Sequence, residues 1–329
     1  MADAGIVLNK IAVMFLVMLA GWLICRRGLL APQFQTALGR LVVDGVFPAL
    51  VFTQMLGSVS PATLRASLWI PVLGLVVMGA AAAIGVLAAR GLRTPTERPT
   101  FAFVIGTPNW VYLPLPIVQG LFGAEGVRTV LLLNLGAQIF LWTGGVAILR
   151  GQFERRDLQQ LVTNPGLLAT VAGIVVALLV PGAGDWGTPQ GDHGFGWFAG
   201  IVVQALAMLG SLTIPLSLLV TGAQLSGLTW DDPSHRGLLA GVVSLRLLVA
   251  PVVTIILIHM LALAGLPLTV VARHTIYLVA AMPVAISCSL FAERFGGDAR
   301  LSASSIFVST LLSLGSVPVL YALIRALGW

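Results

Sequence analysis

Apolar residues fill the chain in long runs, and polar residues gather in the short segments between these runs. A run of about 20 apolar residues is long enough to cross a bilayer as a helix. The runs show no alternation of apolar and polar positions with period two, so they predict helices and not the strands of a barrel. Ten membrane spans are predicted, at residues 6–25, 37–57, 66–90, 100–120, 127–150, 165–181, 198–224, 237–264, 273–294 and 302–326.

Composition agrees with this pattern. Only 9% of the 329 residues are charged and 58% are hydrophobic, whereas about 25% of the residues in a soluble domain are charged. We therefore expect an all-α polytopic membrane protein. The first span is expected to stay attached, because its apolar run is longer than that of a typical signal peptide and no small-residue cleavage site follows it.

Basic residues lie at the ends of the predicted spans and favour one side of the membrane. With the N-terminus outside, 12 of the 18 Lys and Arg residues lie on the cytoplasmic side, as the positive-inside rule requires. Both termini are then outside and the loop 150–165 is cytoplasmic, in a cell (inner) membrane. The net charge of +6 forms no single patch, so nucleic acid is not an expected partner. The exceptions are Lys10, Arg65, Arg128, Arg273 and Arg325 on the outer side, and Arg246 inside the membrane.

The basic linker 151–164 divides the ten spans into five and five, at residues 1–150 and 165–329. An odd number of spans per half forces the halves into opposite orientations, so similarity between them indicates an inverted repeat. The segment "LFGAEGVR" at 121–128 resembles "RFGGDARL" at 294–301, and "VFPALVFTQML" at 46–56 resembles "TIPLSLLVTGAQL" at 213–225. Duplication explains both matches, and chance similarity among Leu-, Val- and Ala-rich segments is the alternative.

Prolines interrupt corresponding spans of the two halves. Span four carries three prolines beside Asn109, and span nine carries one near its middle. A proline removes a backbone donor and frees a carbonyl that lipid cannot satisfy. Corresponding breaks are typical of the midplane binding site of secondary transporters, and simple proline kinks are the alternative. The predicted helix-break positions are Pro108, Pro114, Pro116, Pro283, Pro48 and Pro215.

Several of these segments resemble the auxin efflux carrier family, which includes the plant PIN-like carriers and bacterial permeases. The resemblance lies in Asn109 followed by Pro116 and "LFGAEG", in "NPG" at 164–166, and in "TIPLSLLVTGAQL" at 213–225. The most specific piece is "AMPVAISCSLFAERFGGDARLSASSIFVSTLLSLGSVPVLYAL" at 281–323. Two positions depart from the family pattern: Pro114 stands where a glycine is expected, and Trp110 where smaller residues are usual.

The resemblance implies ten helices in two inverted five-helix repeats, as in sodium/proton antiporters and bile acid symporters. It implies a scaffold of helices one, two, six and seven, and a transport domain of helices three to five and eight to ten, in which broken helices four and nine cross. It further implies a homodimer that carries carboxylated organic anions, such as auxin or malate and malonate.

Exposed amides at broken helices attract anions, and freed carbonyls hold cations. The Asn109 carboxamide and the backbone near two prolines are therefore the expected carboxylate ligands. Asn134 and Gln138 lie one turn apart on one face, where they line a cavity or join helices by hydrogen bonds. The candidate substrate-binding residues are Asn109, Pro116, Pro283, Ser287, Asn134 and Gln138.

Two charges fall deep inside predicted spans, Asp44 in span two and Arg246 in span eight. We expect an ion pair between them that closes the cytoplasmic side. The alternatives are neutralisation of Asp44 by Arg40, one turn earlier, and a protonatable coupling role for Asp44. His259 and His274 are either proton sites or packed and interfacial histidines.

The predicted function is a secondary carrier for small organic anions, with protons as a coupling ion or with none. A channel-like facilitator and a carboxylate sensor are the alternatives. An enzyme is not expected, because no nucleophile and base, paired aspartates or HExxH motif is found in the spans. No cofactor or metal is expected, and Cys25 and Cys288 lie far apart in the sequence, within spans.

Overall fold

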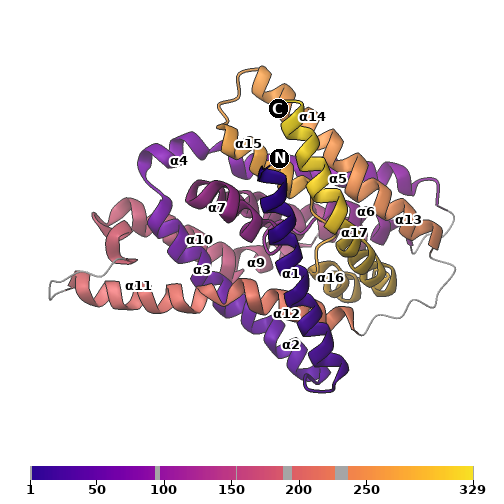
Figure 1. Ribbon diagram of the computed structural model, residues 1–329, viewed down its shortest axis with the longest axis horizontal. Coiled ribbons are helices and arrows are strands. Elements are labelled where there is room, and N and C mark those ends of the chain that lie inside the picture. The colour runs from indigo at the N-terminus through magenta and orange to yellow at the C-terminus, as the bar shows by residue number, and fades with distance from the viewer. Residues whose placement is uncertain (1, 93–96, 153, 188–194, 227–235, 329) are drawn as a thin grey trace. The chain divides into compact units, whose positions relative to one another are not determined.

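The computed structural model describes residues 2–92, 97–152, 154–187, 195–226 and 236–328. Within these ranges the secondary structure is helical, and the one β-bridge is isolated. Figure 1 shows the helices in chain order, from α1 (Ala2–Arg26) to α17 (Ala299–Ala326). The chain forms two compact units that both draw on both halves of the sequence. Unit 1 consists of Met1–Met14, Trp69–Gln159 and Gly227–Trp329, and unit 2 of Phe15–Leu68 and Gln160–Ser226.

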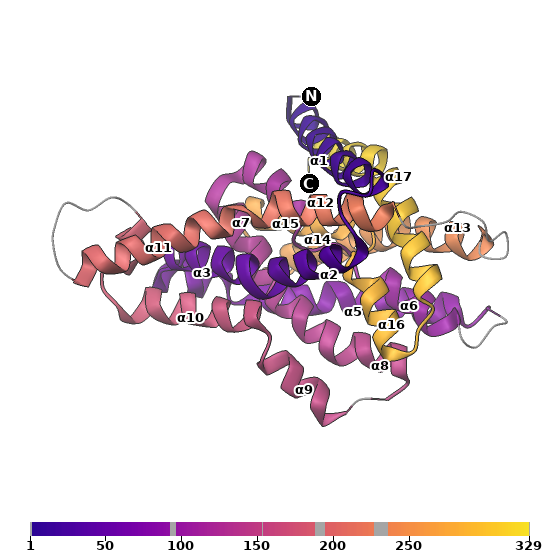
Figure 2. The same cartoon turned by 90° about the horizontal axis from the view of Figure 1, so that it is seen from below.

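Unit 2 is organised around α3 (Phe47–Ser58), which packs against α10 (Pro165–Leu179) and α11 (Phe195–Ser211), as Figure 2 shows. A second contact joins α1 to α12 (Thr213–Leu225) through glycines. A methyl group on Gly222 would overlap the carbonyl of Met18, so only glycine lets these backbones approach. The remaining elements described in unit 2 are α2 (Pro32–Leu41), η1 (Val42–Val46), α4 (Pro61–Ser67) and η3 (Ala183–Gly187).

Unit 1 is built on α5 (Trp69–Ala89), which packs against α6 (Glu97–Gly106) and α7 (Pro114–Phe140). The second half of the sequence adds α15 (Val270–Ala281), which packs on α7, and α17, which packs on α16 (Ser287–Phe295). Helices α5 and α7 approach closely at Gly136, where a methyl group would overlap the Pro71 carbonyl. The other elements described in this unit are η2 (Leu141–Gly145), α8 (Val146–Arg150), α13 (Arg236–Ser244), η5 (Leu245–Val249) and α14 (Ala250–Leu263).

The helices agree with the expectation of a multi-pass membrane protein, whereas the count of ten spans stays a prediction. Six described helices are long and apolar enough to cross a membrane, or seven if the bent pair Arg155–Val162 and Pro165–Leu179 forms one span. Predicted spans four and nine are each interrupted, span four between α6 and α7 and span nine between α15 and α16. The six are Ala37–Ser58, Pro61–Ala89, Pro114–Arg150, Gly196–Ser226, Arg236–Leu263 and Ala299–Ala326.

The boundary between predicted spans four and five falls inside α7. Two helical stretches meet there at Gly123, whose φ of 59° and ψ of −144° are not helical. A side chain at this φ would be strained, whereas glycine adopts it readily. The helix therefore bends at the "LFGAEG" segment that the sequence places between the two spans.

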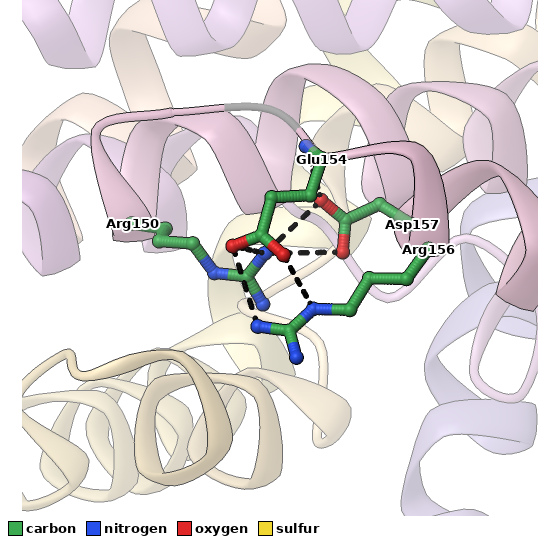
Figure 3. A network of polar contacts seen from close by, with 4 residues as sticks. All are labelled: Arg150, Glu154, Arg156 and Asp157. Atoms are coloured by element: carbon green, nitrogen blue, oxygen red, sulfur yellow. Dashed lines mark hydrogen bonds and ion pairs between the residues drawn. The ribbon is translucent and has the colours of Figure 1, made fainter.

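Charged side chains fix the start of the linker that follows α8. Arg150 Nη1 lies 3.0 Å from Glu154 Oε1 and 3.2 Å from Asp157 Oδ2, and Arg156 Nε lies 2.6 Å from Glu154 Oε2 (Figure 3). The Asp157 side chain is fully buried. The Arg150 guanidinium also lies 4.8 Å from the ring centre of Phe295, at the end of α16. These contacts join the start of α9 (Arg155–Val162) to the helices of unit 1.

The glycine contact between α5 and α7 predicts a stability loss for Gly136→Ala. The added methyl group must displace the backbone at Pro71, which costs about 1–3 kcal/mol by analogy with overpacked cores. Thermal unfolding of the detergent-purified protein measures the loss. Gly79→Ala in α5 is the matched control, because no atom lies within 4 Å of its added methyl group. Equal melting temperatures for the two variants would contradict the packing account.

Candidate functional site

The interruptions of the two split helices meet in unit 1. Helix α6 ends at Gly106 and α7 begins at Pro114, whereas α15 ends at Ala281 and α16 begins at Ser287. We call the segments 107–113 and 282–286 together the crossover. Residues that precede a proline avoid the helical region, and Met282, directly before Pro283, has the extended values φ −66° and ψ 150°.

Backbone hydrogen bonds join the two segments of the crossover. The Asn109 N–H donates to the Pro283 carbonyl at 2.7 Å, and the Ala285 N–H donates to the Thr107 carbonyl at 2.9 Å. These two bonds form an antiparallel bridge that pairs Pro108 with Val284. The breaks therefore satisfy part of each other's exposed backbone, which neither lipid nor a lone kink can do.

Asn109 holds the start of α7 with one end of its carboxamide. Its Oδ1 accepts hydrogen bonds from the N–H groups of Tyr112 and Leu113, at 3.1 and 3.4 Å. The residue is 3% exposed, and its Nδ2 has no hydrogen-bond partner among the described residues. A buried donor without a partner costs about 1–3 kcal/mol, so this nitrogen is a natural position for a ligand oxygen.

Trp110 connects the crossover to the predicted site residues of span five. Its Nε1 donates to Asn134 Oδ1 at 2.8 Å, and both side chains are buried. One end of Asn134 therefore joins two segments, while its Nδ2 has no partner in the described part of the chain. Gln138, one turn further along α7, is half-buried, and its Oε1 likewise has no described partner.

The remaining predicted substrate ligands occupy different parts of the crossover. The Pro283 carbonyl is used by Asn109, and Pro116 is the third residue of α7. Ser287 opens α16 and is half-buried, whereas the Ser289 hydroxyl donates to the Ile286 carbonyl, close to its own helix. Pro48 and Pro215 lie in the first turns of α3 and α12 in unit 2.

One hydrogen-bond partner at the crossover carries no sequence signal. The Ser309 hydroxyl of α17 accepts from the Val284 N–H at 3.1 Å, and Ser309 is fully buried. Serines are frequent in α17, and nothing in their spacing distinguishes this one. Ser309 lies close to the crossover because α17 packs on α15 and α16.

Arg246 lies at the C-terminal ends of α6 and α15, the first helices of the two split pairs. It sits in the π-helical turn η5 and is 1% exposed. Its Nη1 donates to the Ile105 carbonyl at 2.8 Å, and its Nη2 donates to the Ala280 carbonyl. These carbonyls belong to the last turns of α6 and α15, so a single guanidinium joins both C-terminal ends.

Asp44 lies in unit 2, in the π-helical turn η1. Its side chain is exposed, and within the described part of that unit it forms no ion pair with Arg40. Asp44 and Arg246 belong to different units, so their pairing stays a prediction. The histidines differ in packing: His274 is buried between the rings of Phe122, Tyr277 and Tyr321, and His259 is half-buried.

The Trp110–Asn134 contact predicts a stability loss for Trp110→Phe. Phenylalanine fills most of the space but leaves the buried Asn134 Oδ1 without its donor, which costs about 1–3 kcal/mol. The double variant Trp110→Phe/Asn134→Leu removes both polar partners and is expected to regain stability. Melting temperatures in detergent measure both effects, with the exposed Trp69→Phe as control. A double variant less stable than Trp110→Phe alone would contradict this account.

Comparison with known proteins agrees with the resemblance noted in the sequence. A family model described as membrane transport protein matches residues 6–164 and 155–321. A transporter of Methanothermobacter thermautotrophicus, described as uncharacterized, is 28% identical over 318 residues, which cover 94% of this chain and 95% of the relative. A second uncharacterized transporter, from Methanocaldococcus jannaschii, is 21% identical over 316 residues, which cover 93% of this chain and 95% of the relative. The chain therefore belongs to the membrane transport protein family, to which the auxin efflux and PIN-like carriers belong.

Proposed function

We propose that this transporter is a secondary carrier that moves small carboxylated organic anions across the cell membrane by alternating access. The substrate binds at the crossover, and Asn109 is its principal side-chain ligand. Membership of the transport family supports carriage of a solute. The choice of an anion and of this position rests on the chemistry of the crossover.

The buried Nδ2 of Asn109 is the observation that carries the proposal. The Oδ1 of the same carboxamide accepts hydrogen bonds from two backbone N–H groups, so rotation of the amide would break both of them. A carboxylate oxygen is the ligand that completes such a donor. Helices α7 and α16 begin at the crossover, so the partial positive charge of two helix N-termini adds to the attraction.

Neutral donors suit a carrier. A hydrogen bond from an amide to a charged group contributes about 1.5–3 kcal/mol, which allows capture and also release. The buried Arg246 guanidinium is engaged by carbonyls at the C-terminal ends of α6 and α15. The substrate therefore meets hydrogen-bond donors without a direct ion pair.

The division into two units supports alternating access. Unit 2 contains the predicted spans two, six and seven and about half of span one, and unit 1 contains spans four, five and eight to ten and nearly all of span three. We propose that unit 2 is the scaffold and that unit 1 is the transport domain, which carries the crossover. The inverted repeat, the homodimer and both termini outside belong to the same proposal and rest on the resemblance and on charge distribution.

Uptake of labelled malonate, malate and indole acetate into proteoliposomes tests the proposal through Asn109→Asp and Asn109→Ala. Aspartate keeps the oxygen acceptors that cap α7 but replaces the free donor with a second oxygen. We expect it to fold like the wild type and to lose uptake by roughly 10- to 100-fold, the equivalent of one hydrogen bond to a charged group. Alanine loses the cap as well and is expected to lose both uptake and stability. Ser289→Ala, which removes a hydroxyl bonded to the nearby Ile286 carbonyl, is the matched control with near wild-type uptake.

Each outcome separates the proposal from its rivals. Saturable uptake with counterflow supports a carrier, whereas uptake without saturation or counterflow indicates a channel-like facilitator. Binding without uptake indicates a sensor. Stimulation by an imposed proton gradient assigns protons as the coupling ion, and its absence indicates uniport. Undiminished uptake by well-folded Asn109→Asp contradicts the assigned site.

A further inference from the structure

Arg246 is a buried cation whose hydrogen-bond partners among the described residues are all backbone carbonyls. It is among the largest fully buried side chains of the described residues, and it extends from the π-helical turn η5 into unit 1. Two of its three guanidinium nitrogens, Nη1 and Nη2, donate to the carbonyls of Ile105 and Ala280. No described carboxylate of unit 1 forms an ion pair with it.

The ends of two helices supply the balancing charge. Ile105 lies in the last turn of α6, a helix of 10 residues, and Ala280 in the last turn of α15, a helix of 12 residues. The C-terminus of a helix carries the equivalent of roughly half a negative elementary charge. Two such ends therefore offset roughly one positive charge, which is the charge of one guanidinium.

The same carbonyls are ligands of the kind that bind a free cation. In transporters with broken helices, unwound carbonyls and the C-terminal ends of half-helices hold the coupling ion. Here the guanidinium fills that position and cannot dissociate, because it is part of the chain. A second cation at this place would meet an occupied set of carbonyls and a like charge.

We propose that Arg246 is a tethered cation that takes the position of a coupling metal ion between the C-terminal ends of α6 and α15. It keeps the two split helices joined at the crossover while the substrate binds and leaves. Transport through the crossover then needs no free cation at these carbonyls. The statement about transport rests on the proposed function, whereas the statement about the cation position does not.

Truncation with chemical rescue tests the position without any transport assay. Arg246→Ala removes the guanidinium and leaves the two carbonyl ends facing each other, so its melting temperature in detergent is expected to fall well below that of the wild type. Millimolar guanidinium ion restores most of the lost melting temperature, because it is the missing group. Sodium ion is expected to restore part of it, since carbonyls are also sodium ligands.

Three comparisons exclude trivial explanations. Met78→Ala in α5 removes a buried apolar side chain and leaves an apolar cavity. Guanidinium is not expected to stabilise this variant. Wild-type protein is not expected to respond either, because its carbonyls are occupied. Asp44→Asn is expected to melt near the wild type; if Asp44 supplied the balancing charge instead, it would be as unstable as Arg246→Ala.

Conservative variants keep the proposal testable if Arg246→Ala does not yield folded protein. Arg246→Lys retains the charge, and Arg246→Met retains most of the volume without it. We expect the lysine variant to be clearly more stable than the methionine variant. Equal melting temperatures for these two, or a guanidinium response in wild type and Met78→Ala that matches the response of Arg246→Ala, would overturn the proposal.

Transport provides the second arm. Wild-type uptake is expected to be the same in sodium and in choline medium, whereas uptake by Arg246→Ala becomes several-fold higher in sodium or guanidinium medium than in choline. Sodium-dependent uptake by the wild type would overturn the proposal. If neither the wild type nor any variant takes up substrate while guanidinium still restores the stability of Arg246→Ala, the proposed function is overturned and the proposed position of the cation is supported.

Discussion

Backbone groups freed inside a membrane must find partners within the protein, and the crossover is where this constraint is met. Prolines open two helices of a membrane protein, and each opening frees N–H and carbonyl groups that cost several kcal/mol when they are buried and unpaired. The openings pair with each other through the bonds of Asn109 with Pro283 and of Ala285 with Thr107. These two hydrogen bonds bring the breaks of both halves of the sequence together at one place.

The other backbone groups freed by the breaks bind side chains of opposite partial charge. At the C-terminal ends, carbonyls of α6 and α15 receive the Arg246 guanidinium. At the start of α7, N–H groups receive the Asn109 oxygen. The cation of the site is thus fixed within the chain, and the position left for a ligand is a donor. On this account, the proposed anion site needs no basic residue within the crossover segments.

Close helix packing positions these groups. Helix α5 lies against α6 and α7, and glycines allow the contact at Gly136 and at Gly106, where a methyl group would meet Ala82. Gly106 is also the last residue of α6, directly before the break. The residue that ends the helix therefore also lets it approach its neighbour.

Much of the fold was readable from the sequence, because apolar runs and prolines are local signals. The run boundaries lie near the ends of most helices, and the transporter family follows from motifs spread over the chain. The partners of Arg246 were not readable, since it binds carbonyls 141 and 34 residues away and every residue type carries a carbonyl. The Trp110–Asn134 bond was equally hidden: the sequence marks Trp110 only as a bulky departure from the family pattern.

The π-helical turns illustrate the same limit. Asp44 and Arg246 both lie in such turns, η1 and η5. A charge within an apolar run indicates function, but the inserted residue that widens the turn leaves no mark in the composition. The sequence places both charges deep inside predicted spans, whereas the surroundings of the Arg246 side chain depend on the packing of η5 against α6 and α15.

The most direct test of the crossover as the substrate site is an experimental structure with a transported carboxylate bound. The account predicts density for the carboxylate within hydrogen-bond distance of Asn109 Nδ2, with Arg246 still bound to the carbonyls of Ile105 and Ala280. Carboxylate density elsewhere in the protein, with Asn109 Nδ2 bonded only to protein or water, would contradict it.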